Sequence, residues 1–165
     1  MKTNACRLLD AQKIHYDTRE YAVDPDDLTG QTVAKKIGLA QEQVFKTLLC
    51  RVDQAEIVFA VLSVADELDF KKLAAAAGGR RAELVPIKEV QPLTGYVRGG
   101  VTVFGSKKPF PVFADDLMRG FDVISVSAGV RGQQILLAPE DYIRAAEAQL
   151  VSLTRAAGSR DGVLP

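Results

Sequence analysis

Apolar residues are densest in the middle of the chain. They make up most of 44–52 and of 56–63, and the short stretch Asp53-Gln54-Ala55 separates the two runs. Apolar runs of this length are typical of strands, and so short a break is typical of a hairpin loop. The pattern therefore predicts a β-hairpin. Shorter apolar runs predict further strands at 14–21, 82–85, 111–114, 123–127 and 134–137.

Helix signals lie between these strands. Several segments combine helical spacing of apolar residues with a capping residue or a glycine stop. Asn4 opens one such segment, Asp69 caps another, and Pro139 begins the last. Helices are therefore expected at 4–12, between Gly30 and Gly38, at 70–77, at a turn that begins with Pro86, and at 139–150.

Strands outnumber helices in this prediction, and several strands are linked by hairpins. Such a mixture predicts a single α+β domain with a mixed β-sheet, which we assign to residues 1–154. Beyond Thr154 the composition shifts to Ala, Gly, Ser and Arg, so residues 155–165 are expected to form a flexible tail.

The charge balance of the chain excludes one class of nucleic-acid-binding protein. The chain has 165 residues, and 21 Lys and Arg balance 21 Asp and Glu, so the formal net charge is zero. A protein that holds nucleic acid by bulk positive charge is excluded, because that affinity needs many Lys or Arg contacts to phosphates. A small local contact with RNA remains compatible with this balance.

Several features indicate a cytoplasmic protein without a membrane segment. Cys6 and Cys50 are distant from each other and lie in apolar stretches, as reduced core thiols do. The N-terminus lacks the apolar core of a signal peptide, and no run of about 18 apolar residues occurs.

Few side chains could act as a nucleophile, a general base or a metal ligand. His15 is the only histidine, and its position at a strand start favours a surface or structural role. The carboxylates at 24–27 and 115–116 fit solvated turns and caps, and the two cysteines form no zinc set. The segment from Gly100 to Lys107 resembles a phosphate-binding loop, but its Ser and Lys stand in the wrong order. We therefore expect neither a metal nor a cofactor.

Lys46 and one glycine-rich segment remain as candidates. Strand alternation places Lys46 on an apolar face, where its ammonium group either extends past the strand end or lines a pocket for an anionic or hydroxyl-bearing ligand. The segment 94–105, expected to be a loop that passes into a strand, contains the pair Gly99-Gly100. Its backbone N–H groups could approach a ligand and stabilise an oxyanion, or the segment could be a flexible turn.

Five segments of the chain carry recognisable motifs, at 44–49, 68–73, 94–96 with Gly99-Gly100, 105–108 and 126–132. Together they resemble the YbaK/EbsC family of bacterial aminoacyl-tRNA editing proteins, which is related to the editing domain inserted in some prolyl-tRNA synthetases. They occur in the order of the family and extend over residues 4–150. The resemblance is greatest to the Cys-tRNA(Pro) deacylase branch, and it implies a mixed sheet curved toward a barrel with flanking helices.

The resemblance implies roles for individual residues. The lysine of the family falls on Lys46, which is expected to hold the 3′-terminal adenosine of tRNA, and the adjacent hydroxyl falls on Thr47. The glycine loop falls on Gly99 and Gly100, whose backbone is expected to face the scissile ester carbonyl. Further substrate-binding positions implied by the match are Tyr21, Thr94, Gly95, Ser127, Gly129, Arg131 and Gly132.

The resemblance also implies a mechanism without a catalytic histidine or metal. In Cys-tRNA(Pro) editing, the substrate thiol attacks its own ester carbonyl and leaves as a cyclic thiolactone, while the enzyme orients the substrate and stabilises the oxyanion. The implied partners are misacylated tRNA(Pro) and prolyl-tRNA synthetase, in a ternary complex with a monomer of this chain. Deacylation of Ala-tRNA(Pro) or another small misacylated tRNA by water is an alternative. A module that binds tRNA or the synthetase without catalysis is another.

Three positions depart from the family pattern. Val101-Thr102-Val103 follows the glycine pair where the family commonly has x-Ser-Pro, and 128–132 replaces Gly-Gly-Lys-Arg-Gly. Gln133-Gln134 stands where relatives carry a small polar or acidic residue. These departures affect the expected substrate more than the expected fold.

Overall fold

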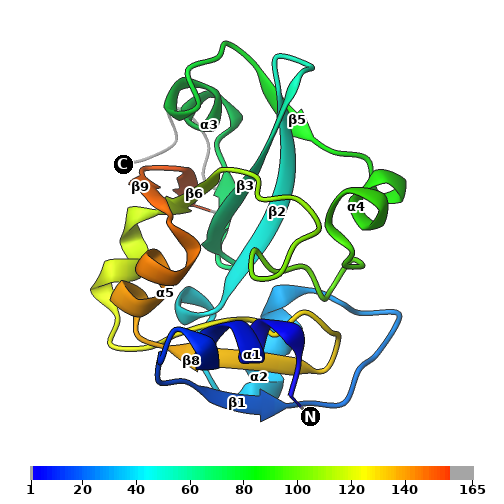
Figure 1. Ribbon diagram of the computed structural model, residues 1–165, viewed down its shortest axis with the longest axis vertical. Helices are drawn as coiled ribbons and strands as arrows, with labels where there is room; N and C mark the ends of the chain where they lie inside the picture. The colour runs from blue at the N-terminus through cyan, green and yellow to red at the C-terminus, as the bar shows by residue number, and fades with distance from the viewer. Residues whose placement is uncertain (1, 157–165) are drawn as a thin grey trace.

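The β2–β3 hairpin is the centre of the computed structural model, which describes residues 2–156 (Figure 1). Its two strands pair antiparallel along their whole length, as the two apolar runs with a short break between them predict. β5 pairs antiparallel with the end of β2, whereas β6 and β9 extend the sheet in parallel beyond β3. The strands of this mixed sheet, in spatial order, are β5 (Ala82–Leu84), β2 (Phe45–Val52), β3 (Glu56–Ser63), β6 (Val112–Asp115) and β9 (Gln149–Val151).

Two smaller antiparallel sheets complete the strand structure. One has the order β1-β8-β7, and the other joins β10 to β4. A bridge between Val44 and Ser125 links the start of β2 to β7. The predicted α+β class and mixed sheet are confirmed, although the strands of residues 2–156 form three sheets and none of these closes into a barrel. The additional strands are β1 (Asp17–Glu20), β4 (Asp66–Leu68), β7 (Ile124–Ser127), β8 (Gln133–Leu137) and β10 (Thr154–Ala156).

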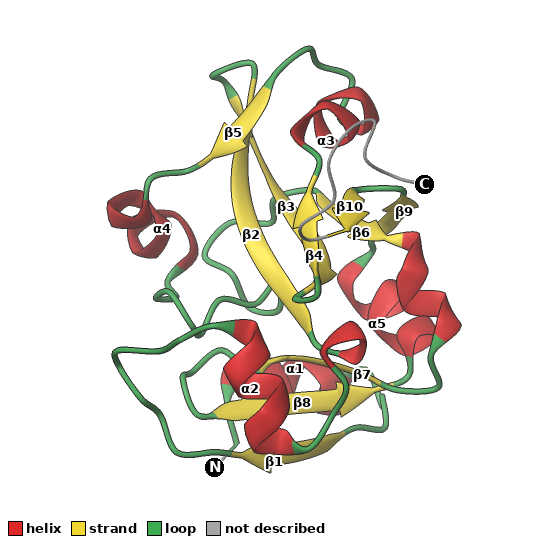
Figure 2. Ribbon diagram, turned by 180° about the vertical axis from the view of Figure 1, so that it is seen from behind, coloured by secondary structure: helices red, strands yellow, loops and turns green. Residues whose placement is uncertain are grey.

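Helices cover the β1-β8-β7 sheet and the ends of the larger sheet. α1 and α2 lie on opposite faces of the smaller sheet, as the front and back views show (Figures 1 and 2). Asp69 caps α3 as predicted, but the cap of α1 is Thr3 rather than Asn4, because the Thr3 hydroxyl accepts from the Cys6 N–H. The helices are α1 (Asn4–Ala11), α2 (Gly30–Ile37), α3 (Phe70–Ala76), α4 (Ile87–Thr94) and α5 (Pro139–Ala146), with short 3-10 helices η1 (Gln41–Gln43) and η2 (Asp116–Gly120).

Three segments differ from the prediction. The last helix ends at Ala146, because Glu147 adopts a left-handed conformation with φ 51° and the chain then joins β6 as β9. The expected strand after the glycine-rich segment does not form, since no strand lies between α4 and β6. β10 pairs with β4 as far as Ala156, so regular structure passes the predicted domain end, and residues 157–165 of the predicted tail lie outside the described residues.

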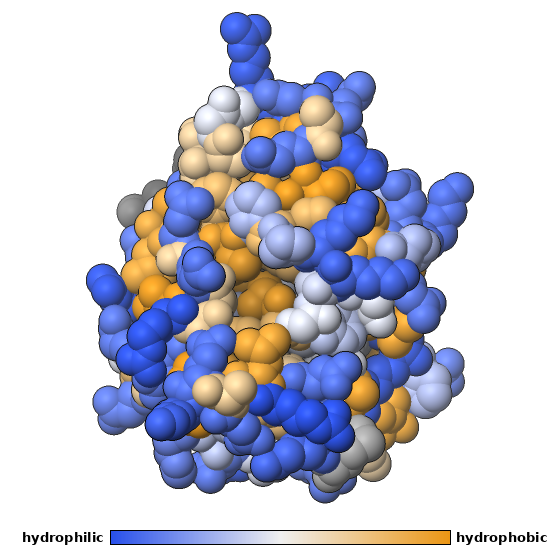
Figure 3. Space-filling view, viewed as in Figure 1, coloured by the Kyte–Doolittle hydropathy of each residue, from blue (hydrophilic) through white to orange (hydrophobic). Residues whose placement is uncertain are grey.

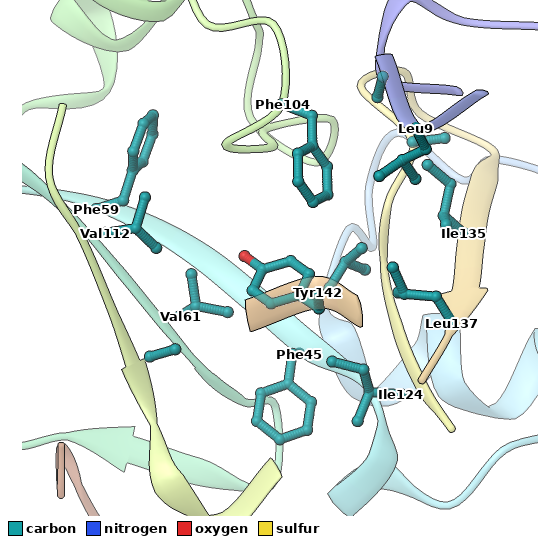
Figure 4. Packing of buried hydrophobic residues seen from close by; sticks show 14 of the residues in the cluster. Leu9, Phe45, Phe59, Val61, Phe104, Val112, Ile124, Ile135, Leu137 and Tyr142 are labelled. Atoms are coloured by element: carbon teal, nitrogen blue, oxygen red, sulfur yellow. The ribbon is translucent and has the colours of Figure 1, made fainter. Parts of the chain in front are cut away.

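Alternate residues of β2 face two different hydrophobic clusters. Phe45 and Leu49 belong to the large cluster between the sheets, whereas Cys50 and Val52 belong to the cluster beneath α3. Tyr142 lies at the centre of the large cluster, between side chains of the β2–β3 hairpin and of β8 (Figure 4). Apolar side chains also reach the surface in the middle of the face drawn in Figure 3, with polar side chains around them.

α2 begins against a buried valine, and this contact favours glycine at its first position. A Cβ built on Gly30 would lie 2.1 Å from Cγ1 of Val64. Because the valine is only 3% exposed and has little room to move, Gly30→Ala is expected to lower the free energy of unfolding by about 1–3 kcal/mol. Urea denaturation measures this change, and a second substitution, Val64→Ala, should recover part of it. An unchanged unfolding midpoint for Gly30→Ala would contradict the contact.

Candidate functional site

A pocket of about 420 Å³ lies where one edge of β2 has no partner strand. β5 pairs with β2 only over Cys50–Val52, and the bridge to β7 lies at Val44, so the edge over 45–49 has no partner strand on that side. The walls around this edge come from α2, α4, the loop that follows α4, and the β7–β8 pair. The apolar walls include Leu28, Val33, Leu84, Val85, Ile87, Val90 and Val101, and the polar side chains are Lys46, Thr47, Arg98, Ser127 and Gln134.

A second hollow, of about 510 Å³, lies between α2 and η1. It is more open, and its lining contains none of the site residues predicted from the sequence. The pocket at the β2 edge is therefore the candidate site.

Lys46 lines this pocket from β2. Its Nζ donates a hydrogen bond to the backbone carbonyl of Asp66 at 3.1 Å, and no carboxylate of the described residues lies within 4.0 Å of it. Burial lowers the pKa of Lys46, whereas the negative charges of Asp66 and Glu67 oppose this shift. A partly desolvated ammonium group whose charge is not paired directly is suited to an anionic or hydroxyl-bearing ligand.

The glycine pair has two separate functions in the structure. Gly99 lines the pocket with φ 87°, a conformation that side chains rarely adopt, and its N–H has no hydrogen-bond partner within residues 2–156. The N–H of Gly100, in contrast, donates to the carbonyl of Val97 at 2.8 Å. The prediction that the Gly100 N–H faces the ligand is therefore corrected, because this N–H is already bonded within the loop. Gly99 remains as the candidate donor of the pair.

Gly100 instead permits close packing of two loops. A Cβ built on it would lie 3.1 Å from backbone atoms of Val130 and Arg131. The side chain of Arg131 continues this contact, because its Nε donates to the carbonyl of Arg98 at 2.8 Å. The loop between β7 and β8, residues 128–132 (the late loop), thus packs behind the glycine pair.

Of the predicted site residues around the β7–β8 loop, one lines the pocket and the others lie behind its walls. Ser127 lines it, and its hydroxyl accepts a hydrogen bond from the N–H of Gly129 at 3.1 Å. Gly129 packs against the ring of Tyr96, and the carbonyl of Gly132 accepts from the N–H of Tyr21 at 2.9 Å. Gly129, Arg131 and Gly132 do not line the pocket, so their geometric contribution is to hold its walls.

The remaining predicted residues are mostly outside the pocket. Thr47 lines it from β2. Tyr21 lines a small adjoining hollow, which shares Leu28, Val33 and Gly99 with the main pocket. Thr94 and Gly95 end α4, since the buried Thr94 hydroxyl donates to the carbonyl of Val90 and Gly95 has φ 87°. The structure therefore gives Thr94 and Gly95 a structural position.

Sequence reasoning assigned no role to several pocket residues. Arg98 lies within the glycine-rich segment, but nothing in its pattern separated it from a surface arginine. Gln134 is 5% exposed, and its Oε1 accepts from the Ser125 hydroxyl at 2.7 Å while the side chain borders the pocket. The departure from the family pattern at Gln134 was the one signal that could have found it. Leu84 and Ile87, which are exposed apolar residues, carried no signal at all.

The side chains that line the pocket are suited to binding a ligand and to polarising its polar groups. No His, Cys, Asp or Glu is among the described residues that line it. Within residues 2–156, no group of three such side chains is placed to hold a metal ion, and no helix has both the length and the hydropathy to cross a membrane. The lining supplies a cation, amide and hydroxyl groups, and apolar walls for an uncharged part of a ligand.

Comparison with known proteins identifies the class to which this fold and pocket belong. The model of the aminoacyl-tRNA editing domain family matches residues 24–145. EbsC of Enterococcus faecalis, a candidate Cys-tRNA(Pro)/Cys-tRNA(Cys) deacylase, is 38% identical over 153 residues, which cover 93% of each chain. ProXp-y of Escherichia coli, a multifunctional Ser/Thr-tRNA deacylase, is 34% identical over 131 residues, which cover 77% of this chain and 78% of its own.

A solved structure has the same fold. The crystal structure of a candidate trans-editing enzyme for prolyl-tRNA synthetase superposes with a TM-score of 0.79 at 22% identity, over 94% of this chain and 99% of its own. Fold and sequence together place the chain among proteins that edit aminoacyl-tRNA. It belongs to the aminoacyl-tRNA editing domain family, which confirms the resemblance found in the sequence.

Proposed function

We propose that the protein is a trans-editing deacylase that cleaves the ester of misacylated Cys-tRNA(Pro). One observation carries the proposal: the described lining of the pocket offers a cation and hydrogen-bond donors but no cysteine nucleophile and no histidine or carboxylate that could activate its hydroxyl groups. Such a site can accelerate a reaction whose nucleophile belongs to the substrate, because orientation and oxyanion stabilisation alone lower the barrier greatly.

The step is an intramolecular acyl transfer. The sulfur of the cysteinyl group attacks the ester carbonyl carbon, a C–S bond forms, and the C–O bond to the terminal ribose breaks. The thiol proton goes to the ribose oxygen, so the products are a cyclic thiolactone and deacylated tRNA. Lys46 holds the phosphate or ribose oxygens of the terminal adenosine, and the Gly99 N–H donates to the developing oxyanion. Ser127 and Thr47 border the cysteinyl ester.

The zero net charge bears on how the tRNA is recognised. With 21 basic and 21 acidic residues, the chain offers few contacts to phosphates beyond the pocket. We therefore propose that prolyl-tRNA synthetase supplies much of the recognition of tRNA(Pro) in a ternary complex. We also propose that the chain acts as a monomer in the cytoplasm.

The first test compares esters that differ only at the amino-acid side chain. We expect Cys-tRNA(Pro) to be deacylated at least tenfold faster than Ala-tRNA(Pro), because alanine has no internal nucleophile. Measured at equal enzyme concentration against controls without enzyme, S-methylcysteinyl-tRNA(Pro) should be as resistant as the alanyl ester. It keeps the sulfur atom but carries a methyl group in place of the thiol proton, so the sulfur cannot attack as a thiolate.

The opposite preference supports a second function. The neutral Gln134 side chain at the pocket and the likeness to a Ser/Thr-tRNA deacylase favour cleavage of a small hydroxyl-bearing or alanyl ester by water. Rapid loss of the seryl or alanyl ester would therefore replace the thiol mechanism. If no ester is cleaved, with or without prolyl-tRNA synthetase, a tRNA-binding module without catalysis is the better description.

A further inference from the structure

The open edge of β2 has a defined hydrogen-bonding direction. In an antiparallel pair, the N–H and C=O groups of alternate residues point to the partner strand, and those of the residues between them point away. The carbonyl of Val44 accepts from Val64 on the β3 side, whereas the carbonyl of Leu49 accepts from Val85 on the other side. The peptide groups of Phe45, Thr47 and Leu49 therefore point away from β3, toward the pocket that all three residues line.

No strand of residues 2–156 pairs with this side of β2 between the bridge at Val44 and the start of the β5 pairing at Cys50. Among Phe45, Thr47 and Leu49, the peptide group bonded to a loop or turn of these residues is the carbonyl of Leu49, which accepts from the N–H of Val85. Unpaired strand edges are suited to pairing with an added group of matching donors and acceptors. Along this edge the C=O of Phe45 is followed by the N–H of Thr47, and the C=O of Thr47 is followed by the N–H of Leu49. The edge therefore offers two acceptor–donor pairs.

The surroundings favour a flat, uncharged ring at this edge. Leu84, Ile87 and Val90 supply an apolar wall beside it. Lys46 lies within the same stretch of β2 and brings a cation to the pocket. A ligand with an aromatic ring near a phosphate or a sugar matches both features. A nucleotide is such a ligand.

We propose that the open edge of β2 reads the adenine base of the nucleotide held at Lys46. The amino group of adenine donates to the carbonyl of Phe45 or Thr47, and the adjacent ring nitrogen accepts from the N–H two residues further along, at Thr47 or Leu49. This inference rests on the proposed function, because the 3′-terminal nucleoside of tRNA is adenosine. It makes the main chain of the strand, rather than a side chain, the element that recognises the base.

The test uses nucleotides without an amino acid. Adenosine 5′-monophosphate and inosine 5′-monophosphate differ at the position where adenine has a donor and hypoxanthine an acceptor. Titration of the full chain should give a dissociation constant roughly tenfold or more higher for the inosine nucleotide. Equal constants, or no binding of either nucleotide at millimolar concentration, would overturn the proposal.

Amide hydrogen exchange locates the contact. In the free protein, the N–H groups of Thr47 and Leu49 should exchange faster than those of Lys46 and Leu48, which pair with β3. Adenosine 5′-monophosphate should slow exchange at Thr47 or Leu49 and leave Lys46 and Leu48 unchanged. Protection elsewhere in the chain without protection at these two residues would place the base at another surface.

A proline substitution tests the donor directly. Thr47→Pro removes an N–H that makes no bond to β3, and proline is tolerated on the open side of an edge strand. Discrimination between the two nucleotides should fall toward one if the Thr47 N–H is the donor used, whereas Thr47→Val keeps the N–H and should keep the discrimination. If Thr47→Pro does not fold, the comparison of nucleotides with the unchanged chain still decides. Persistence of full discrimination in a folded Thr47→Pro chain, without protection of the Leu49 N–H, would contradict the proposal.

The two proposals fail in different ways. Discrimination between the nucleotides without any deacylation would reject the proposed function and keep the recognition of adenine. Rapid deacylation with equal nucleotide affinities would do the reverse.

Discussion

Lys46→Ala is expected to lower kcat/KM for Cys-tRNA(Pro) by roughly tenfold to a hundredfold, with the chain still folded. Hydrogen bonds to a charged group in a partly buried site contribute about 1.5–3 kcal/mol, and each 1.36 kcal/mol is a factor of about ten in rate. The substitution leaves only a backbone carbonyl of Asp66 without its donor, so the unfolding free energy should change by about 1 kcal/mol or less.

An exposed lysine provides the matched control for this variant. Lys71 is exposed on α3, away from the pocket, and Lys71→Ala removes the same charge from the chain. Single-turnover deacylation and urea denaturation should be measured for both variants. Equal rates for Lys46→Ala and Lys71→Ala, in folded protein, would remove Lys46 from the mechanism.

Gly100→Ala is expected to reduce deacylation by roughly tenfold or more, because a small displacement of a positioned group has a large effect on rate. The added methyl group would lie 3.1 Å from the backbone of Val130 and Arg131, so the glycine loop and the late loop must separate by a few tenths of an ångström. That movement displaces the adjacent Gly99 N–H from the pocket.

Gly120→Ala is the matched control for the glycine pair. A Cβ at Gly120 meets nothing within 4 Å, so this substitution should leave both rate and stability near those of the unchanged chain. Nucleotide affinity at Lys46 separates the causes, since Gly100→Ala should weaken catalysis more than binding of adenosine 5′-monophosphate. A Gly100→Ala chain with full activity would show that the loops pack loosely enough to absorb the methyl group.

Much of the central architecture could be predicted from local patterns. The hairpin of β2 and β3 followed from two apolar runs with a short break between them, and the Asp69 cap of α3 from residue type. β4, β9 and β10 were not predicted, because three residues show no reliable period and pairing with a partner strand decides their conformation. The same reason explains why the last helix was predicted to run through β9. β5 is equally short but falls within the predicted run 82–85.

The candidate site divides in a similar way. Lys46, Thr47, Gly99 and Ser127 were expected from the motifs, and the fold brings all four to one pocket. The engaged N–H of Gly100 could not be predicted, since it depends on a turn closed by the carbonyl of Val97.

By itself, the sequence determined the apolar runs of the hairpin, the Asp69 cap, the zero net charge and the order of the family motifs, because these depend only on the identity and order of the residues. The tertiary structure alone decided which edge of β2 stays open, and that Leu84, Ile87 and Gln134 border the pocket beside it. These features join segments distant along the chain. No local period records how long a partner strand will be, and the short length of β5 is what leaves the edge of β2 open to a ligand.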